Sequence, residues 1–141
     1  MSEITELPVE FLFTMHLELA APVLMPSGPH GTRVFVTVLN GTVAGPKITG
    51  TVVPSSGADW VTVRADGYSQ LDVRLLITTD DGAVVSMQYG GILDTGPDRR
   101  PRTAPVFQSS HERYLWLNNV QGVAIGTPGR NEVTYQVYAL A

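Results

Sequence analysis

The chain contains no cysteine and only one lysine, Lys47, among its 141 residues. The lack of cysteine excludes disulfides, thiolate nucleophiles and cysteine-based zinc sites, and it fits a reducing compartment. The eight arginines are dispersed and the net charge is −4. Phosphate contacts need clustered Lys and Arg, so we expect neither nucleic acid nor an anionic membrane surface as a partner.

Long apolar segments are also lacking, since no run approaches the roughly 20 residues that span a bilayer. The N-terminus opens acidic and polar, whereas a signal peptide needs a basic region before its apolar stretch. We therefore expect a cytoplasmic protein. An apolar fraction of 43% and a charged fraction of 16% are globular values. The length predicts one domain over residues 1–141, with residues 1–7 as a flexible tail.

Fourteen glycines and ten prolines divide the chain into short segments. Residues 11–19 alternate with period two, which predicts a strand. Between two apolar runs, Asp80-Asp81-Gly82 indicates a hairpin, because glycine supplies positive φ. Further strands are expected at residues 33–40, 47–53, 60–64, 71–78, 83–89, 114–118, 122–125 and 133–140.

Two segments are expected to be irregular. Residues 21–32 are too rich in proline and glycine for a helix, and we interpret them as a loop. Residues 93–107 carry Arg99, Arg100 and Arg102 among prolines. Connections of this length are usually functional or disordered, so this segment is either a solvated loop or a lid.

About eight to ten short strands at regular spacing, with negligible helix, predict an all-β fold. Sequential hairpins with few long connections favour an antiparallel, mostly up-and-down β-barrel. Most strands have two opposed faces, and so small a barrel cannot hide both. We therefore expect a homo-oligomer, most simply a dimer with two-fold symmetry.

Sorting the strand residues by parity separates an aliphatic face from a mixed face. The aliphatic face comprises Val61, Val63, Leu71, Val73, Leu75, Ile77, Leu115 and Leu117. The mixed face comprises Thr14, His16, Glu18, Trp60, Thr62, Arg64, Asp72, Arg74, Leu76, Thr78, Tyr114, Trp116 and Asn118.

Two interpretations of these faces are open. In the first, the aliphatic face is the core, the mixed face meets solvent, and Asp72 and Arg74 form a weak charge ladder. That arrangement leaves the large aromatic side chains outside, where they usually mark an interface. In the second, the mixed face lines a cavity, because aromatic walls with a few polar groups are typical of ligand pockets.

The second interpretation supplies a candidate site. Asp72, Arg74, Arg64 and Tyr114 are the catalytic candidates, since they provide acids, bases and oxyanion donors. The hairpin at Asp66-Gly67 is expected to bring Arg64 beside Asp72. The binding candidates are Trp60, Trp116, Asn118, His16, Glu18 and Tyr89.

Metal and cofactor motifs do not appear. His16 and Glu18 share one strand face but lack a third ligand at a diagnostic spacing, so no metal site is expected. No Gly-x-Ser-x-Gly elbow and no glycine-rich phosphate loop occur. We therefore expect no cofactor.

Six motifs together resemble one family of small β-barrels, the domain-of-unknown-function 3237 family, also called uncharacterised protein family 0311. They are Gly45-Pro46, Asp59-Trp60, Arg64 with Asp66-Gly67, Leu71-Asp72-Val73-Arg74, Asp81-Gly82, and Tyr114 with Trp116-Leu117-Asn118. The resemblance covers roughly residues 9–140, with Asn40 where the family often has glycine. It implies a barrel and self-association but no particular chemistry, and it favours the cavity interpretation.

Three functions fit these observations. The first is a cofactor-independent acid–base enzyme of isomerase, cyclase or lyase and hydratase type. Its substrate would be small and partly apolar, with a carbonyl, a carboxylate or an aromatic ring. The second is a barrel that binds a small ligand without chemistry. The third is a structural homo-oligomer whose aromatic face is an interface.

Overall fold

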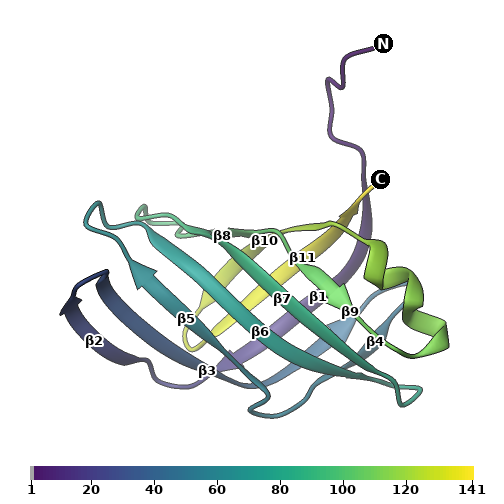
Figure 1. Ribbon diagram of the computed structural model, residues 1–141, viewed down its shortest axis with the longest axis horizontal. Coiled ribbons are helices and arrows are strands. Elements are labelled where there is room, and N and C mark those ends of the chain that lie inside the picture. Colours follow the sequence, from purple (N-terminus) through teal and green to yellow (C-terminus); the bar gives the residue numbers. More distant parts are fainter. Residues whose placement is uncertain (1) are drawn as a thin grey trace.

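A computed structural model describes residues 2–141, of which 62% lie in strands and 6% in helix (Figure 1). The elements are β1 (Val9–Leu19), β2 (Val23–Gly28), β3 (Gly31–Ala44), β4 (Thr49–Val52), β5 (Gly57–Val63), β6 (Ser69–Thr79), β7 (Val84–Leu93), β8 (Pro101–Thr103), β9 (Val106–Gln108), the 3₁₀ helix η1 (Glu112–Asn119), β10 (Gly122–Gly129) and β11 (Glu132–Leu140).

Eight strands close an antiparallel barrel. Starting from β1, the ring runs β3, β5, β6, β7, β8, β10 and β11, and β11 pairs with β1 again. Neighbours in the ring follow one another along the chain, apart from three short strands. Of these, β2 pairs with β3, β9 pairs with β7, and β4 lies between β3 and β6 beyond the end of β5. The predicted antiparallel, up-and-down barrel with negligible helix is therefore confirmed.

The aliphatic face points inward. On β6 the side chains of Leu71, Val73, Leu75 and Ile77 are buried, while the alternate positions from residue 70 to residue 76 are exposed. Burying aliphatic groups is the main favourable contribution to folding, and the barrel interior is where it occurs. For the strands, the first interpretation is correct in placing the aliphatic face in the core, and the cavity interpretation of the mixed face is wrong. The expected Asp72–Arg74 ion pair does not form within residues 2–141, and in η1 the burial is reversed, with Tyr114 buried and Leu115 exposed.

A β-bulge shifts the register of β1. Phe11 pairs with Tyr138 whereas Phe13 pairs with Val137, so Leu12 is the extra residue between them. Leu12 and Phe13 are consequently both buried, and Phe11 turns outward against the ring of Tyr138 at 5.6 Å. The bulge interrupts the alternation that the sequence of β1 suggests.

Three segments differ from expectation. The expected loop at 21–32 contains β2, whose one proline, Pro26, is tolerated because the outer side of β2 is an edge. The long segment 93–107 contributes β8 and the start of β9. The expected strand at 114–118 is part of η1, since the buried residues Tyr114 and Leu117 lie three apart, as a 3₁₀ helix requires.

Both Asp-Gly turns form as predicted. Gly67 and Gly82 each have φ of 89°, in the region where a side chain would be strained. The first turn joins β5 to β6 and the second joins β6 to β7. These turns set the register of the β5–β6–β7 meander, and that register decides which side chains enter the barrel.

The two ends of the barrel differ. The end beside η1 is filled by large side chains, including Phe13 and Phe107, whose rings meet edge to face at 5.9 Å. The tail before β1 extends away from the barrel (Figure 1), and residue 1 lies outside the described residues. Within residues 2–141, no helix has the length and hydropathy needed to cross a bilayer.

The closed end depends on Leu117, which is 0% exposed, whereas Leu115 on the same helix is 47% exposed. We expect Leu117→Ala to lower the free energy of unfolding by about 2–5 kcal/mol, because it leaves a cavity in packed core. Leu115→Ala should change it by less than about 0.5 kcal/mol. Urea denaturation of both variants measures the difference. Equal effects of the two substitutions would contradict this account of how the closed end is packed.

Candidate functional site

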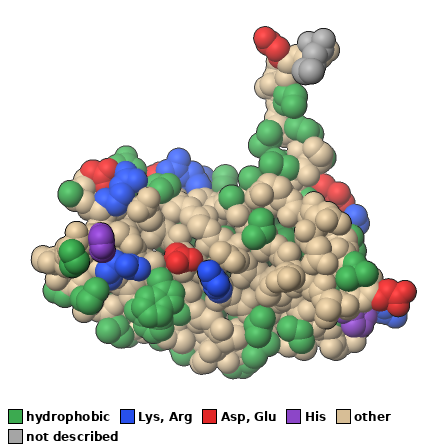
Figure 2. All heavy atoms as spheres, viewed as in Figure 1, with side chains coloured by type: hydrophobic (Ala, Val, Ile, Leu, Met, Phe, Trp, Pro, Cys, Tyr) green, Lys and Arg blue, Asp and Glu red, His purple; other side chains and the backbone are tan. Residues whose placement is uncertain are grey.

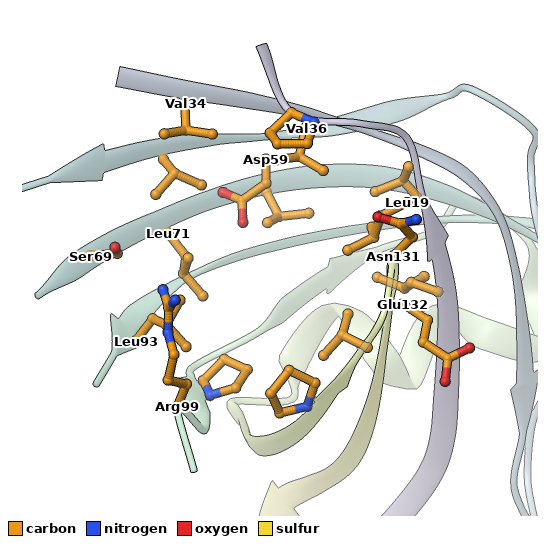
Figure 3. Close-up of a pocket in the computed structure, with 18 of the residues that line it drawn as sticks. Leu19, Val34, Val36, Asp59, Ser69, Leu71, Leu93, Arg99, Asn131 and Glu132 are labelled. Carbon is orange, nitrogen blue, oxygen red and sulfur yellow. The ribbon is translucent and has the colours of Figure 1, made fainter. Parts of the chain in front are cut away.

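The end of the barrel opposite η1 is hollow. A cavity of about 470 Å³ opens there between β3, β5, β6 and the turn that joins β10 to β11. Most of its wall is aliphatic, as Figure 3 shows for Val34, Val36, Leu71 and Leu93. An apolar cavity with a few polar groups is the usual form of a small-molecule site.

Asp59 is the carboxylic acid inside this wall. It lies on β5 on the same face as Val61 and Val63, and Figure 3 shows its carboxylate among the aliphatic lining residues. Burial raises the pKa of Asp59 to about 6, because the charged form loses water. A backbone hydrogen bond from Asp72 opposes the shift, and the negative charge of Asp72 adds to it.

A hydrogen bond made within a gap in β5–β6 pairing holds the Asp59 side chain in place. Its Oδ1 accepts a hydrogen bond of 3.0 Å from the backbone N–H of Asp72 on β6. The β5–β6 ladder pairs Asp59 with Val73 and resumes only at Thr62, so the side chain takes a donor inside the gap. The strands approach closely just before it, where a Cβ on Gly57 would lie 1.8 Å from the Arg74 carbonyl oxygen.

Two tyrosines form the floor of the cavity. Tyr89 on β7 and Tyr135 on β11 are buried, and their rings meet edge to face at 5.3 Å. Burial raises the pKa of both phenols above the usual range. The negative charge of Asp59, which lines the same cavity, raises both further. Both phenols stay neutral and can donate hydrogen bonds.

Asp59, Tyr89 and Tyr135 together can move a proton within an apolar cavity. A carboxyl group with a pKa near neutrality exchanges protons in both directions at physiological pH. The two neutral phenols can orient a polar atom of a ligand. Within residues 2–141, no three acidic or histidine side chains are placed to hold a metal ion.

The predicted centre around Asp72 lies on the opposite side of the wall. Trp60, Asp72 and Arg74 are exposed on the outer surface of β5 and β6. Their predicted place inside the cavity is wrong, because the aliphatic neighbours of alternate parity fill the interior. They instead line a shallow depression on the outside of the sheet with Arg33 and Phe35.

Arg64 does not meet Asp72 either. Its guanidinium binds the carboxylate of Asp66 at 2.6 Å and lies over the ring of Tyr68. The hairpin at Asp66-Gly67 forms as expected, but its tight register places Arg64 opposite Tyr68. The predicted contact fails because Asp72 lies four residues further along β6.

Three predicted site residues fasten the closed end of the barrel. The Tyr114 hydroxyl donates to Asp81 at 2.8 Å, and hydrogen bonds from Thr79, Tyr114 and Arg113 lower the pKa of Asp81 to about 2. Trp116 donates to a backbone carbonyl of η1. Asn118 exchanges two hydrogen bonds with the backbone of Ser109. These contacts hold η1 over the packed core, away from the cavity.

His16 and Glu18 lie on the outer face of β1. His16 contacts the Thr134 hydroxyl at 2.9 Å and Glu132 at 3.6 Å, so it belongs to a surface network between β1 and β11. Glu18 is exposed. Of the predicted candidates, Tyr89 lines the cavity.

Parity could have identified Asp59 from the sequence. It stands two residues before Val61 and four before Val63, so it is a carboxylate on the aliphatic face. A charged group on a core face is rare unless it has a partner or a function. Tyr135 gives no such signal, because a tyrosine among inward positions is ordinary core.

Comparison with known proteins identifies the family. Residues 7–102 match the family described as "Protein of unknown function (DUF3237)". The chain belongs to this family. The resemblance inferred from the six motifs is therefore confirmed.

One relative carries the name of an enzyme. The chain is 35% identical over 131 residues to the hydroalkoxylation enzyme phnH of Penicillium herquei, covering 92% of this chain and 80% of that protein. The crystal structure of an enzyme from the same organism superposes with a TM-score of 0.76 and 30% identity, covering 99% of this chain and 98% of that one.

A bacterial relative shares the fold without a known activity. The crystal structure of a conserved protein of unknown function from Rhodopseudomonas palustris superposes with a TM-score of 0.89 and 26% identity. The match covers 98% of this chain and all of that chain, at 100%. The family is thus a β-barrel family in which one homologue is named as an enzyme.

The raised pKa of Asp59 predicts a pH-dependent cost in stability. The folded state binds the Asp59 proton more tightly than the unfolded state, so the free energy of unfolding is highest below about pH 4 and falls as pH rises to about 6. Asp59→Asn keeps the acceptor for the Asp72 N–H and removes the titration. Above pH 7 we expect the variant to be more stable than wild type by up to about 3 kcal/mol, with little difference near pH 4.

Urea denaturation at pH 4, 6 and 8 measures this difference. Asp80→Asn is a matched control, because Asp80 is an exposed carboxylate in the β6–β7 turn at the closed end, outside the cavity. A gap between Asp59→Asn and wild type that is the same at all three pH values would refute the raised pKa.

Proposed function

We propose that this protein is a cofactor-independent enzyme that adds an O–H group across a carbon–carbon double bond within one small, partly apolar molecule. The observation that carries the proposal is the Asp59 carboxyl group, with its raised pKa, in an aliphatic cavity. The relative named hydroalkoxylation enzyme supports this reaction type, since hydroalkoxylation is the addition of an alcohol or phenol to an alkene.

The addition needs a proton in one place and releases one in another. Neutral Asp59 donates its proton to one alkene carbon, forming a C–H bond and breaking the π bond. The substrate hydroxyl attacks the other alkene carbon, forming a C–O bond. The Asp59 carboxylate then accepts the hydroxyl proton, which restores the acid. Nothing is oxidised or reduced, and the product has the mass of the substrate.

A pKa of about 6 suits both halves of this cycle. A general acid–base group works best when its pKa lies near the working pH, because both protonation states are then accessible. Tyr89 and Tyr135 stay neutral, so either can hold the substrate hydroxyl by a hydrogen bond. Positioning the two reacting groups of one molecule lowers the entropic barrier.

The aliphatic wall supports the same reaction. Side chains such as Val61, Leu71 and Val73 offer no competing nucleophile to an electron-poor carbon. They also keep bulk water from most of the surface of a bound molecule. Addition of the internal hydroxyl is therefore favoured over addition of water.

A prenylated phenol, 2-(3-methylbut-2-enyl)phenol, tests the reaction, because it holds both groups and its alkene forms a tertiary cation. We expect cyclisation to an isomeric ether, with one deuterium on carbon when the solvent is D₂O. The rate should fall about tenfold per pH unit above pH 6, since the protonated acid is required. Asp59→Asn should lower the rate by at least about 100-fold.

Asp80→Asn should cyclise this phenol at the wild-type rate. Cyclisation that survives in Asp59→Asn would exclude Asp59 as the acid. If the phenol binds in the cavity but neither it nor other unsaturated phenols and alcohols cyclise, the enzyme proposal fails and the non-catalytic ligand-binding barrel is supported.

A further inference from the structure

We propose that Arg99 at the cavity mouth binds an anionic group of the ligand, so that the substrates are apolar molecules with a carboxylate or another anion at one end. This inference rests on the proposed function for its substrate class, and its test measures binding without turnover. Arg99 is the one Lys or Arg among the described residues that line the cavity. Figure 3 shows its guanidinium directed across the mouth toward Ser69 and Leu71.

Two other arginines at this rim, Arg102 and Arg64, are already neutralised within the chain, whereas Arg99 is not. Arg102 binds the carboxylate of Asp94, and Arg64 binds Asp66. Within residues 2–141 Arg99 makes no ion pair. A cation that faces an apolar cavity without a carboxylate of its own attracts an anion from outside.

Glu132 does not cancel this charge. Although it lies at the rim, its Oε2 is 3.6 Å from Nε2 of His16, on the outside of β1 and β11. In Figure 3 its carboxylate is turned away from Arg99. Asp59, deeper in the cavity, is largely neutral below pH 6, so below that pH an anion at the mouth meets one cation and little repulsion.

The backbone of the loop holds Arg99 in an uncommon conformation. Its φ is 40°, in the left-handed region that non-glycine residues seldom adopt, and its N–H donates to the Gly96 carbonyl at 3.2 Å. Such strain persists where surrounding structure supports it, and it often accompanies ligand contacts. Here it turns the side chain toward the cavity, whereas Arg100 is exposed and does not line it.

The orientation of a bound ligand follows from the positions of Arg99 and Asp59. A ligand enters with its apolar body among the valines and leucines and its anion at the mouth. The far end of the molecule then lies beside Asp59 and the two tyrosines. Arg99 is therefore a specificity residue that sets which end of the substrate reaches the acid.

Two probes of matched size test this, 1-naphthoate and 1-naphthalenemethanol, which carry a carboxylate and a neutral alcohol. Methyl NMR shifts of Val61 and Leu71 report binding inside the cavity. We expect Arg99→Gln to weaken 1-naphthoate about three- to tenfold and to leave 1-naphthalenemethanol unchanged within about twofold. Arg99→Lys should restore most of the loss, and Arg100→Gln should change neither affinity.

Unchanged affinity for 1-naphthoate in Arg99→Gln, or equal loss for both probes, would overturn the inference. Absence of cyclisation together with an intact charge preference would remove the proposed function and leave the anion site standing. Cyclisation without any charge preference would do the reverse.

A second and independent observation concerns the outer face. We infer that this face binds a second copy of the chain through the Trp60 surface, defined as Val23, Met25, Phe35, Trp60, Asp72 and Arg74. Trp60 is 55% exposed although its ring packs edge to face on Phe35 at 4.6 Å. Figure 2 shows hydrophobic side chains gathered over β2, β3 and β5, bordered by charged ones.

The register builds this surface as a continuous row across the strands. Val23 pairs with Phe35, and Phe35 pairs with Trp60. Val23 and Met25 are 64% and 58% exposed, so the row continues to the edge of β2. Exposed aromatic and aliphatic groups in one patch mark a protein interface.

Charge identifies the occupant of the Trp60 surface. Asp72 and Arg74 lie two residues apart on one strand face, and neither forms an ion pair within residues 2–141. A two-fold axis through the patch places each Asp72 against Arg74 of the other copy. Arg33 also borders this face, where its Nε donates to the Val61 carbonyl oxygen at 3.4 Å. A patch that carries charges of both signs beside an apolar centre is complementary to itself across a two-fold axis.

A charge swap tests this pairing. We expect wild type at about 50 µM to have twice the mass of the single chain by light scattering. Asp72→Arg should be monomeric, because it brings like charges together, and the double variant Asp72→Arg/Arg74→Asp should recover the dimer. Glu18→Arg, on the far side of β3, should remain dimeric. A monomeric wild type, or a dimeric Asp72→Arg, would exclude a second copy as the occupant.

Discussion

Closure of the eight-stranded ring is the constraint on which the rest of this structure depends. A barrel of eight strands has an interior that side chains can just fill, so each inward position either contributes to the core or leaves space. Along the barrel axis of this protein, one half of the interior is filled and the other half is left open. Toward η1, aromatic and thioether side chains such as Phe13 and Met87 fill the interior. Toward the other end, valines are too short to meet across the barrel, and a cavity remains.

The groups suited to acid–base chemistry lie at the boundary between the packed half and the hollow half of the barrel. Tyr89 and Tyr135 belong to the packed core and also line the cavity. Their rings close the floor of the cavity whose wall holds Asp59, at the interruption of the β5–β6 ladder. The same lack of water that raises the pKa of Asp59 also makes its hydrogen bonds and charge more influential.

The fold could largely be predicted from the sequence, because period-two alternation and Asp-Gly turns are local signals. Both turns formed, and the aliphatic parity at Leu71 and Val73 marks the interior. The strand β2 and the helix η1 could not be predicted, since they depend on tertiary contacts. Pairing with β3 overrides the effect of Pro26 in β2, and the hydrogen bond from Tyr114 to Asp81 fastens η1 to the β6–β7 turn.

The candidate site was harder to predict, because most of the residues with conspicuous chemistry lie on the outside of the barrel whereas the carboxylic acid of the site lies on its inside. Trp60, Asp72 and Arg74 attract attention by their chemistry, yet polar groups in a closed barrel belong outside unless something holds them within. Asp59 is held within by a backbone donor that appears only in the three-dimensional register. Parity marks Asp59 as unusual, but the sequence of β5 does not reveal the break in β5–β6 pairing that accommodates its side chain.

Burial of Asp59 lowers stability at neutral pH, and the architecture localises that cost. One hydrogen bond from the Asp72 backbone partly compensates the carboxylate, and the packed half of the barrel supplies the stability that the hollow half lacks. A fully compensated carboxylate would have an ordinary pKa and would be a poor proton donor at pH 7. Incomplete compensation is therefore the property that suits Asp59 to acid–base chemistry, and a rigid, closed barrel is what allows a small domain to retain it.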